Sequence, residues 1–208
     1  MSSTGHELPL GRLEALSDGV FAIAITLLVL ELGVSADAGA HLFASILHQW
    51  PSYLAYVTSF LTIGVVWLGH SAITSALRAA DGTLYRLNLI VLLLASFLPF
   101  PTKLVAEFIG EDSPERTAVV FYGLVLLALD ISLTVLLRYA AEQRQLLKDG
   151  IDDVVAEEAW QRRPSYAFYA VAIGVGFLLP TVGVALYLAI ALFLAVPMRT
   201  VHRLLRRR

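Results

Sequence analysis

Two carboxylates bracket the first long apolar run of the chain. Asp18 lies in the polar segment 12–19, and Glu31 closes the apolar run 20–30 that follows. The twelve uncharged residues between the two carboxylates would span about 18 Å as a helix, against about 30 Å for the hydrocarbon core of a bilayer. If this run crosses a membrane, a carboxylate lies at membrane depth, where charged groups are costly and are default functional candidates.

Other residues whose side chains could catalyse a reaction or bind a metal are sparse. The chain has no cysteine, its five histidines are scattered, and it contains neither His-Glu-x-x-His nor Gly-x-Ser-x-Gly. We therefore expect no metal site, no cofactor and no enzymatic activity. The composition likewise gives no support for a nucleic-acid partner.

The elements that must hold these residues are transmembrane helices. Hydrophobic residues make up 58% of the 208 residues, charged residues 15%, and the mean hydropathy is +0.74. These values predict an all-α integral membrane protein with a single domain over 1–208. Six spans are predicted, with the break between the last two at Pro180-Thr181-Val182-Gly183: 14–33, 51–72, 86–108, 116–139, 165–180 and 183–199.

The positive charges set the orientation. All fifteen Lys and Arg residues except Lys103 and Arg116 fall on one side of this six-span scheme. By the positive-inside rule, both termini are cytoplasmic and the loop 33–49 is external. Residues 138–164 form a cytoplasmic link that continues the fourth helix and then becomes amphipathic, with a break near Gly150. The basic tail 199–208 is expected to contact anionic lipid.

The first helix presents two different faces. At 100° per residue, Ile23, Leu27 and Leu30 share one stripe with Gly19 and Thr26, whereas Ser17 and Asp18 point away from it. Without further information, lipid contact or helix packing is the commoner role of such an apolar stripe.

Several polar residues fall at one depth. Arg12, Ser17 and Asp18 of the first span, Trp67 and His70 of the second, and Asn88 of the third all belong to the cytoplasmic half. Such a cluster can hold three helices together, or His70 and Asp18 can relay protons.

Two further features are expected to serve helix packing. Asp130 should pair with a neighbouring helix, and Pro99 and Pro101 should kink or end the third helix.

These motifs together resemble a known family. Arg12-x-x-x-Leu16-Ser17-Asp18-Gly19, Trp67-x-x-His70, Asn88 and Phe97-Leu98-Pro99-Phe100 are similar to the prokaryotic branch of the transmembrane protein 175 family, known in animals as lysosomal potassium channels. Leu16 stands where the family motif has Phe, a departure that concerns local packing.

The resemblance implies a homotetramer in which the first helix lines a central pore. It assigns the pore constriction to Ile23, Leu27 and Leu30, and an ordering role to Thr26. It further implies that the remaining motif residues form a network within each subunit that holds the first helix in place: Arg12, Ser17, Asp18, Trp67, His70 and Asn88.

The resulting hypothesis is a channel for potassium and other monovalent cations in the bacterial inner membrane. Glu31 would concentrate cations at the external mouth. The alternative is a small secondary transporter or proton-coupled exchanger that uses intramembrane carboxylates and His70. No internal repeat is visible in the sequence to support that alternative.

Overall fold

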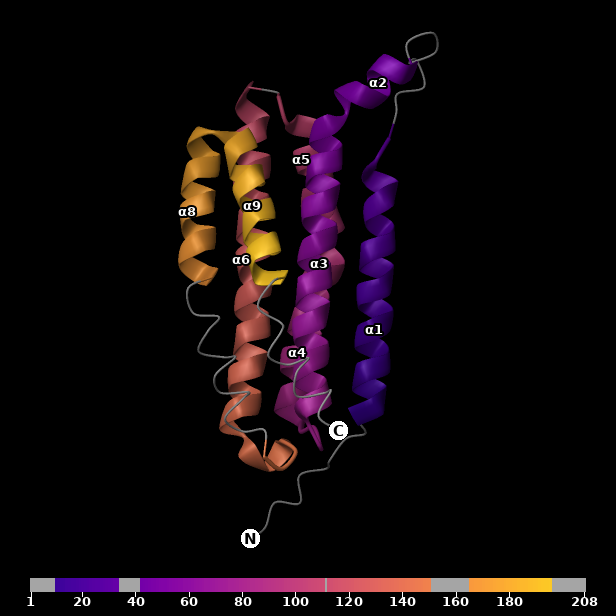
Figure 1. Ribbon diagram of the computed structural model, residues 1–208, viewed down its shortest axis with the longest axis vertical. Coiled ribbons are helices and arrows are strands. Elements are labelled where there is room, and N and C mark those ends of the chain that lie inside the picture. Colours follow the sequence, from indigo (N-terminus) through magenta and orange to yellow (C-terminus); the bar gives the residue numbers. More distant parts are fainter. Residues whose placement is uncertain (1–9, 34–41, 111, 151–164, 196–208) are drawn as a thin grey trace.

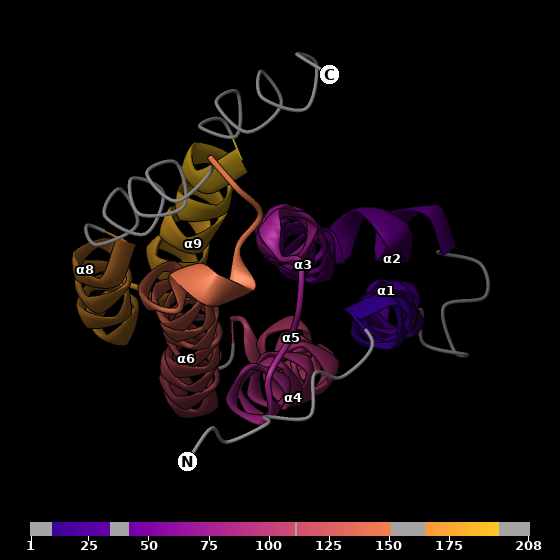
Figure 2. The ribbon, with the colours of Figure 1, turned by 90° about the horizontal axis from the view of Figure 1, so that it is seen from below.

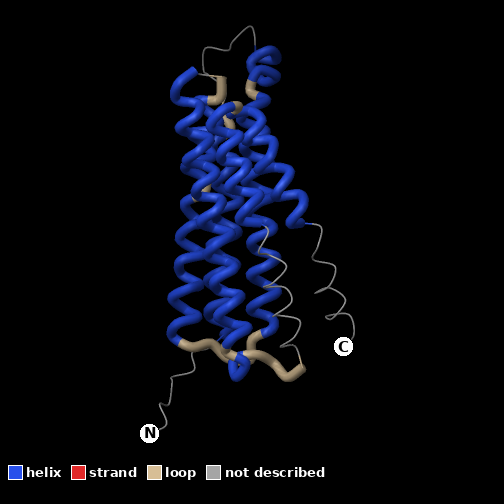
Figure 3. Tube along the Cα trace, turned by 90° about the vertical axis from the view of Figure 1, so that its left-hand side faces the viewer, coloured by secondary structure: helices blue, strands red, loops and turns tan. Residues whose placement is uncertain are grey.

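The chain folds into an all-helical bundle. The computed structural model describes residues 10–33, 42–110, 112–150 and 165–195, and the helices stand side by side along one long axis (Figure 3). The helices are α1 (Leu10–Leu27), α2 (Leu42–His48), α3 (Trp50–Ala76), α4 (Gly82–Phe97), α5 (Pro99–Phe108), α6 (Asp112–Glu142), α8 (Ser165–Leu178) and α9 (Pro180–Ala195), with short 3-10 turns η1 (Leu28–Glu31) and η3 (Arg144–Leu146). The predicted all-α class is confirmed for this part of the chain.

Four segments have the length and hydropathy of membrane spans. They are Leu10–Glu31, Trp50–Ala76, Gly82–Phe108 and Pro114–Glu142, which match the first four predicted spans. The apolar helices α8 and α9 are shorter, at 14 and 16 residues. Their lengths correspond to about 21 and 24 Å, short of a hydrocarbon core of about 30 Å.

The boundary between the last two helices differs from the prediction. Helix α8 ends at Leu178 and α9 begins at Pro180, so the predicted turn residues form the first turn of α9. Proline suits this position because the first backbone amides of a helix have no partner within it. The first α-helical bond runs from Gly183 N to Leu179 O, 2.9 Å apart. The prediction of a break at 180–183 is therefore wrong by a few residues.

The predicted effect of the two prolines is confirmed. Helix α4 ends at Phe97 and α5 starts at Pro99, with Leu98 between them. A proline lacks the amide that would continue the ladder of hydrogen bonds. At the far end of α5, Gly110 adopts a φ of 93°, which favours glycine, and the chain turns into α6.

The region predicted as an external loop contains a helix that the sequence pattern did not reveal. Helix α2 lies at the end of the bundle opposite the start of α1 (Figure 1). Its seven residues include Phe43, which is strongly exposed. The side-chain Nε2 of Gln49, just after α2, donates to the backbone oxygen of Gly33 and so ties this region to the segment that follows η1.

Contacts between helices place α3 at the centre and α1 at an edge. Helix α3 packs against α1, α5, α6 and α9. Helix α6 also packs against α4 and α8. Helix α1 lies against α3 and α4, and an end-on view shows α3 on one of its sides and α4 on the other (Figure 2). The side of α1 turned away from the bundle is therefore left open.

The predicted link after the fourth span begins as expected. Helix α6 continues to Glu142, and the following backbone pairs with the α3–α4 turn through a bridge between Leu77 and Leu147. Arg78 Nε also donates to the oxygen of Gln145, at 2.7 Å. The predicted amphipathic part of the link at 151–164 and the tail 199–208 lie outside the described residues.

The α8–α9 hairpin depends on a close contact between two glycines. A Cβ atom added at Gly183 would lie 2.4 Å from Gly176 Cα, whereas one added at Gly174 would meet nothing within 4 Å. We expect Gly183→Ala to lower the free energy of unfolding by about 1–3 kcal/mol, because backbone must move to admit the methyl group. Thermal unfolding of detergent-solubilised protein measures this, with Gly174→Ala as the control. Equal melting temperatures for the two variants would contradict the packing described here.

Candidate functional site at helix α1

Helix α1 has one buried side that faces the bundle. Leu13, Ser17, Phe21, Ala24 and Leu28 are all buried, at spacings of three and four residues. These spacings keep the five side chains on one face of the helix. Val20 and Ile25 are partly buried beside this face, and the opposite side of the helix is open to lipid, water or another chain.

The predicted apolar stripe lies on the open side. Ile23, Leu27 and Leu30 are 60%, 41% and 72% exposed. The 3-10 turn that begins at Leu28 was not predicted, but it keeps the stripe intact, because residues three apart eclipse each other in this geometry and Leu30 therefore follows Leu27. Thr26 is also exposed, and its hydroxyl donates to the backbone oxygen of Ile23, at 2.9 Å.

Asn88 connects three helices on the buried side of α1. Its Nδ2 donates to Ser17 Oγ at 3.1 Å, and its Oδ1 accepts from His70 Nε2 at 2.5 Å. Ser17 in turn donates to the oxygen of Leu13, at 2.8 Å. All three polar side chains are almost fully buried, so they satisfy one another where water is absent.

Phe21 extends the contact between α1 and α3. Its ring meets the His70 imidazole edge-on, with centroids 5.4 Å apart and an interplanar angle of 61°. Aromatic pairs favour this geometry. The His70 ring is therefore held by Phe21 on α1 and by Asn88 on α4.

Asp18 forms a second link between α1 and α3. Its Oδ1 accepts from Trp67 Nε1, at 2.8 Å, although both side chains are exposed in the single chain. Arg12 is exposed as well, and its side chain bonds to no other described residue. Five of the six predicted network residues thus form two neighbouring links, and Arg12 stands apart from them.

Glu31 ends η1 and is partly exposed. It lies one residue beyond Leu30, at the end of the stripe nearest α2. This carboxylate lies beside the end of the apolar stripe, and its predicted place at the external mouth of a pore stays a prediction.

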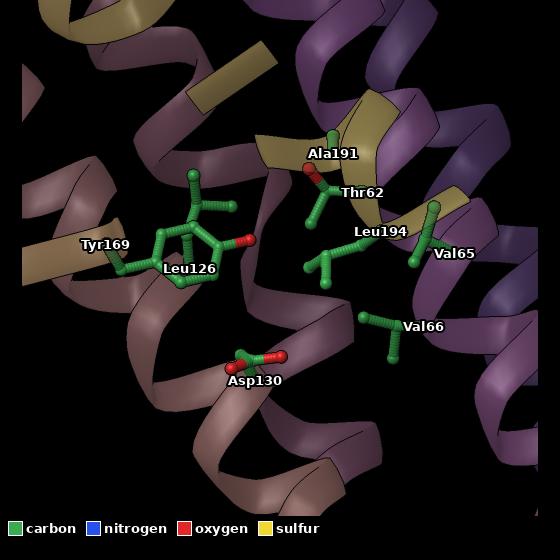
Figure 4. A pocket seen from close by; sticks show the side chains of 8 residues that line it. All are labelled: Thr62, Val65, Val66, Leu126, Asp130, Tyr169, Ala191 and Leu194. Atoms are coloured by element: carbon green, nitrogen blue, oxygen red, sulfur yellow. The ribbon is translucent and has the colours of Figure 1, made fainter. Parts of the chain in front are cut away.

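Asp130 pairs with a neighbouring helix, as predicted. Its Oδ2 accepts from Ser165 Oγ, at 2.6 Å, which joins α6 to the start of α8. Figure 4 shows Asp130 beside a small cavity that Thr62 of α3 and Tyr169 of α8 also line. The cavity volume is about 10 Å³, close to the least that can admit one water molecule.

One polar cluster escaped the sequence analysis. Ser59 Oγ lies 2.6 Å from Thr102 Oγ1 and 2.7 Å from Tyr122 Oη, so it joins α3 to α5 and α6. The signal available in the sequence was three hydroxyl residues within one apolar span, at 58, 59 and 62. Periodicity alone could not identify their partners on other helices.

No group of His, Asp and Glu side chains that could hold a metal ion occurs within the described residues. The polar side chains near α1 instead form hydrogen bonds with side chains on neighbouring helices. Helix α1 is therefore held by hydrogen bonds and packing against α3 and α4, and one apolar face of it stays open.

Comparisons with known proteins agree with this architecture. The model of the family described as endosomal/lysosomal potassium channel TMEM175 matches residues 12–99. A protein of Streptomyces collinus named as a potassium channel is 37% identical over 188 residues, covering 88% of this chain and 90% of that protein. The human endosomal/lysosomal proton channel TMEM175 is 32% identical over 119 residues, which cover 52% of this chain and 24% of the human protein.

Solved structures show the same fold. The crystal structure of a lysosomal potassium-selective channel TMEM175 homolog from Chamaesiphon minutus superposes with a TM-score of 0.81 and 36% identity, covering 91% of this chain and 98% of that one. The structure of the potassium channel MtTMEM175 T38A variant gives a TM-score of 0.62 at 21% identity, which supports the fold alone. This chain is a multi-pass membrane protein that belongs to the TMEM175 channel family.

Proposed function

We propose that the protein is a potassium-favouring cation channel in which α1 lines a central pore of a homotetramer. One observation carries the proposal: Ser17 and Asp18 bond α1 to α4 and α3, while the apolar stripe Ile23, Leu27 and Leu30 faces away from the bundle. Several copies that bring these stripes together around one axis enclose a pore with apolar walls.

The constriction selects among cations by how readily each ion loses its hydration water. Rings of Ile23, with Leu27 and Leu30 above it toward the external side, offer no oxygen ligands to replace water. A narrow apolar ring of this kind can gate by dewetting and pass an ion that sheds part of its hydration shell. Potassium sheds water more readily than sodium, and the ring therefore favours potassium without a coordinating cage. Thr26, bonded to the oxygen of Ile23, helps to order the helix at this level.

The links through Asn88 and Asp18 keep the constriction at a fixed radius. Small rotations of α1 would move the stripe off the pore axis. Hydrogen bonds to α3 and α4 oppose such rotation at the cytoplasmic half of the helix. These residues therefore act on conduction through the position of Ile23 and Leu27.

The remaining features complete the channel. All six spans cross the bacterial inner membrane, with α8 and α9 as the shorter fifth and sixth and both termini in the cytoplasm. Glu31 gathers cations at the external mouth. The basic tail contacts anionic lipid, and monovalent cations pass without a cofactor or a chemical step.

Flux through purified protein in liposomes tests the proposal. An outward potassium gradient with a protonophore should produce rapid potassium efflux. An equal outward sodium gradient should produce slower sodium efflux. Empty liposomes supply the background. Flux that saturates and requires a proton gradient would instead support the secondary transporter, and absence of flux would contradict both.

Proton conduction is a second candidate, favoured by the name of the animal relatives. The human, mouse and chicken proteins are named endosomal/lysosomal proton channels, whereas the bacterial relatives are named potassium channels. Liposomes prepared without the protonophore, with an enclosed pH dye, an acidic outer buffer and equal potassium clamped by valinomycin on both sides, separate the two activities. Acidification of their lumen faster than in empty liposomes would assign proton conduction to this chain.

A further inference from the structure

The edge position of α1 constrains how copies must meet. In a closed ring with α1 at the centre, each subunit joins its neighbours through the two sides that flank α1, and one side must fit the other. Figure 2 shows α3 on one side of α1 and α4 on the other. This step depends on the proposed function, because it assumes that α1 lines the pore.

The α3 side carries an open stripe. Phe60 and Trp67 are 40% and 39% exposed. Gly64 lies between them on the same face, and a Cβ atom added there would meet nothing within 4 Å. This stripe, named here the α3 flank, is a shallow surface with a gap at its centre where Gly64 has no side chain.

The α4 side carries larger side chains. Leu93 and Phe97 are 66% and 41% exposed, and Arg86 is exposed on the same face nearer the start of the helix. The spacings of seven and four residues keep the three side chains on one face. This stripe is named here the α4 flank, and Leu93 projects from its centre.

The two flanks match in depth. The bond between His70 and Asn88 sets a common level for α3 and α4. Gly64 lies six residues outward from His70 and Leu93 five residues outward from Asn88, which puts both about 8–9 Å above that level. By the same measure, Phe60 and Phe97 both lie about 14–15 Å above it.

The flanks also match in charge. Asp18 lies beside Trp67 at the α3 flank and is exposed within a membrane span, where lipid contact would be costly. Arg86 at the α4 flank has no ion pair with any described residue of its own chain. Ser17 and Asn88 are bonded, so Asp18 and Arg86 differ in depth by only a few ångströms. Opposite charges at one level favour a protein partner over lipid on these surfaces.

We infer that a second copy of this chain docks its α4 flank on the α3 flank, with Leu93 against Gly64, Phe97 against Phe60, and Arg86 facing the Asp18–Trp67 pair. Each subunit uses both flanks once, and the contact therefore repeats around the ring until it closes. The Asp18–Trp67 link then serves two purposes: it holds α1 within its own subunit and presents the second carboxylate oxygen to the neighbour.

Disulfide cross-linking tests this contact, and the absence of native cysteine makes the background clean. Gly64→Cys with Leu93→Cys, oxidised in membranes, should yield dimers, trimers and tetramers on a denaturing gel, since a disulfide needs Cα atoms about 4.4–6.8 Å apart. Phe60→Cys with Phe97→Cys is a second pair at another depth. Gly64→Cys with Val171→Cys is the control, because Val171 is 64% exposed on α8, on the far side of the bundle.

The outcomes separate this inference from the proposed function. Ladders from either predicted pair and none from the control would support the contact. An oligomer that conducts potassium but gives no ladder from either pair would overturn the contact and leave the channel proposal standing. A monomeric protein without flux would contradict both.

Discussion

Ile23→Ala is expected to increase potassium flux several-fold and to reduce the preference for potassium over sodium by up to about tenfold, a change of about 1.4 kcal/mol. The reason is the size of the ring. Shortening a branched side chain at the narrowest level widens the pore, so that sodium can pass with more of its water. Leu27→Ala, one turn further out, should change flux and selectivity in the same direction, but less.

Single-channel recording with potassium and sodium on opposite sides measures both quantities. Val29→Ala is the matched control, because Val29 is 50% exposed on the same segment but lies off the stripe. Its conductance and reversal potential should equal those of the wild type. If both Ile23→Ala and Leu27→Ala also behave like the wild type, the stripe does not form the constriction.

Local periodicity separated the apolar stripe of α1 from Ser17 and Asp18, whereas the assignment of that stripe to a pore came from the family resemblance. The stripe and the buried side follow from the spacing of residues along one helix, and the bundle preserves that spacing even where α1 tightens at Leu28. Asn88 and His70 could be grouped because polar residues in apolar spans must find partners at their own depth.

Other features depend on contacts between distant segments and were not predictable in this way. Asp130 bonds to Ser165, which lies 35 residues later in the chain on another helix. The α8–α9 turn shifted because Pro180 is as compatible with the first turn of a helix as with a loop. Helix α2 has only seven residues, too few for its periodicity to distinguish it from a loop.

Asn88→Ala is expected to lower the free energy of unfolding by about 1–3 kcal/mol, because it leaves the buried His70 imidazole without its partner on α4. Potassium selectivity should fall as well, since α1 loses its bond to α4 through Ser17. Ser96→Ala is the control on the same helix: Ser96 is exposed and bonds only within its own turn, to the oxygen of Leu93. That variant should match the wild type in melting temperature and selectivity.

A double-mutant cycle isolates the contact itself. Asn88→Ala, His70→Ala and the double variant, compared by thermal unfolding in detergent, should give a coupling energy of about 0.6 kcal/mol, the average for hydrogen bonds between membrane helices, and at most about 1.7 kcal/mol. The cycle subtracts what each side chain contributes to packing elsewhere, including the contact of His70 with Phe21. Strictly additive effects would mean that the two side chains pack independently. In that case the hydrogen bond that joins α3 to α4 contributes nothing measurable to stability, and the loss of selectivity in Asn88→Ala would have to come from the lost bond to Ser17.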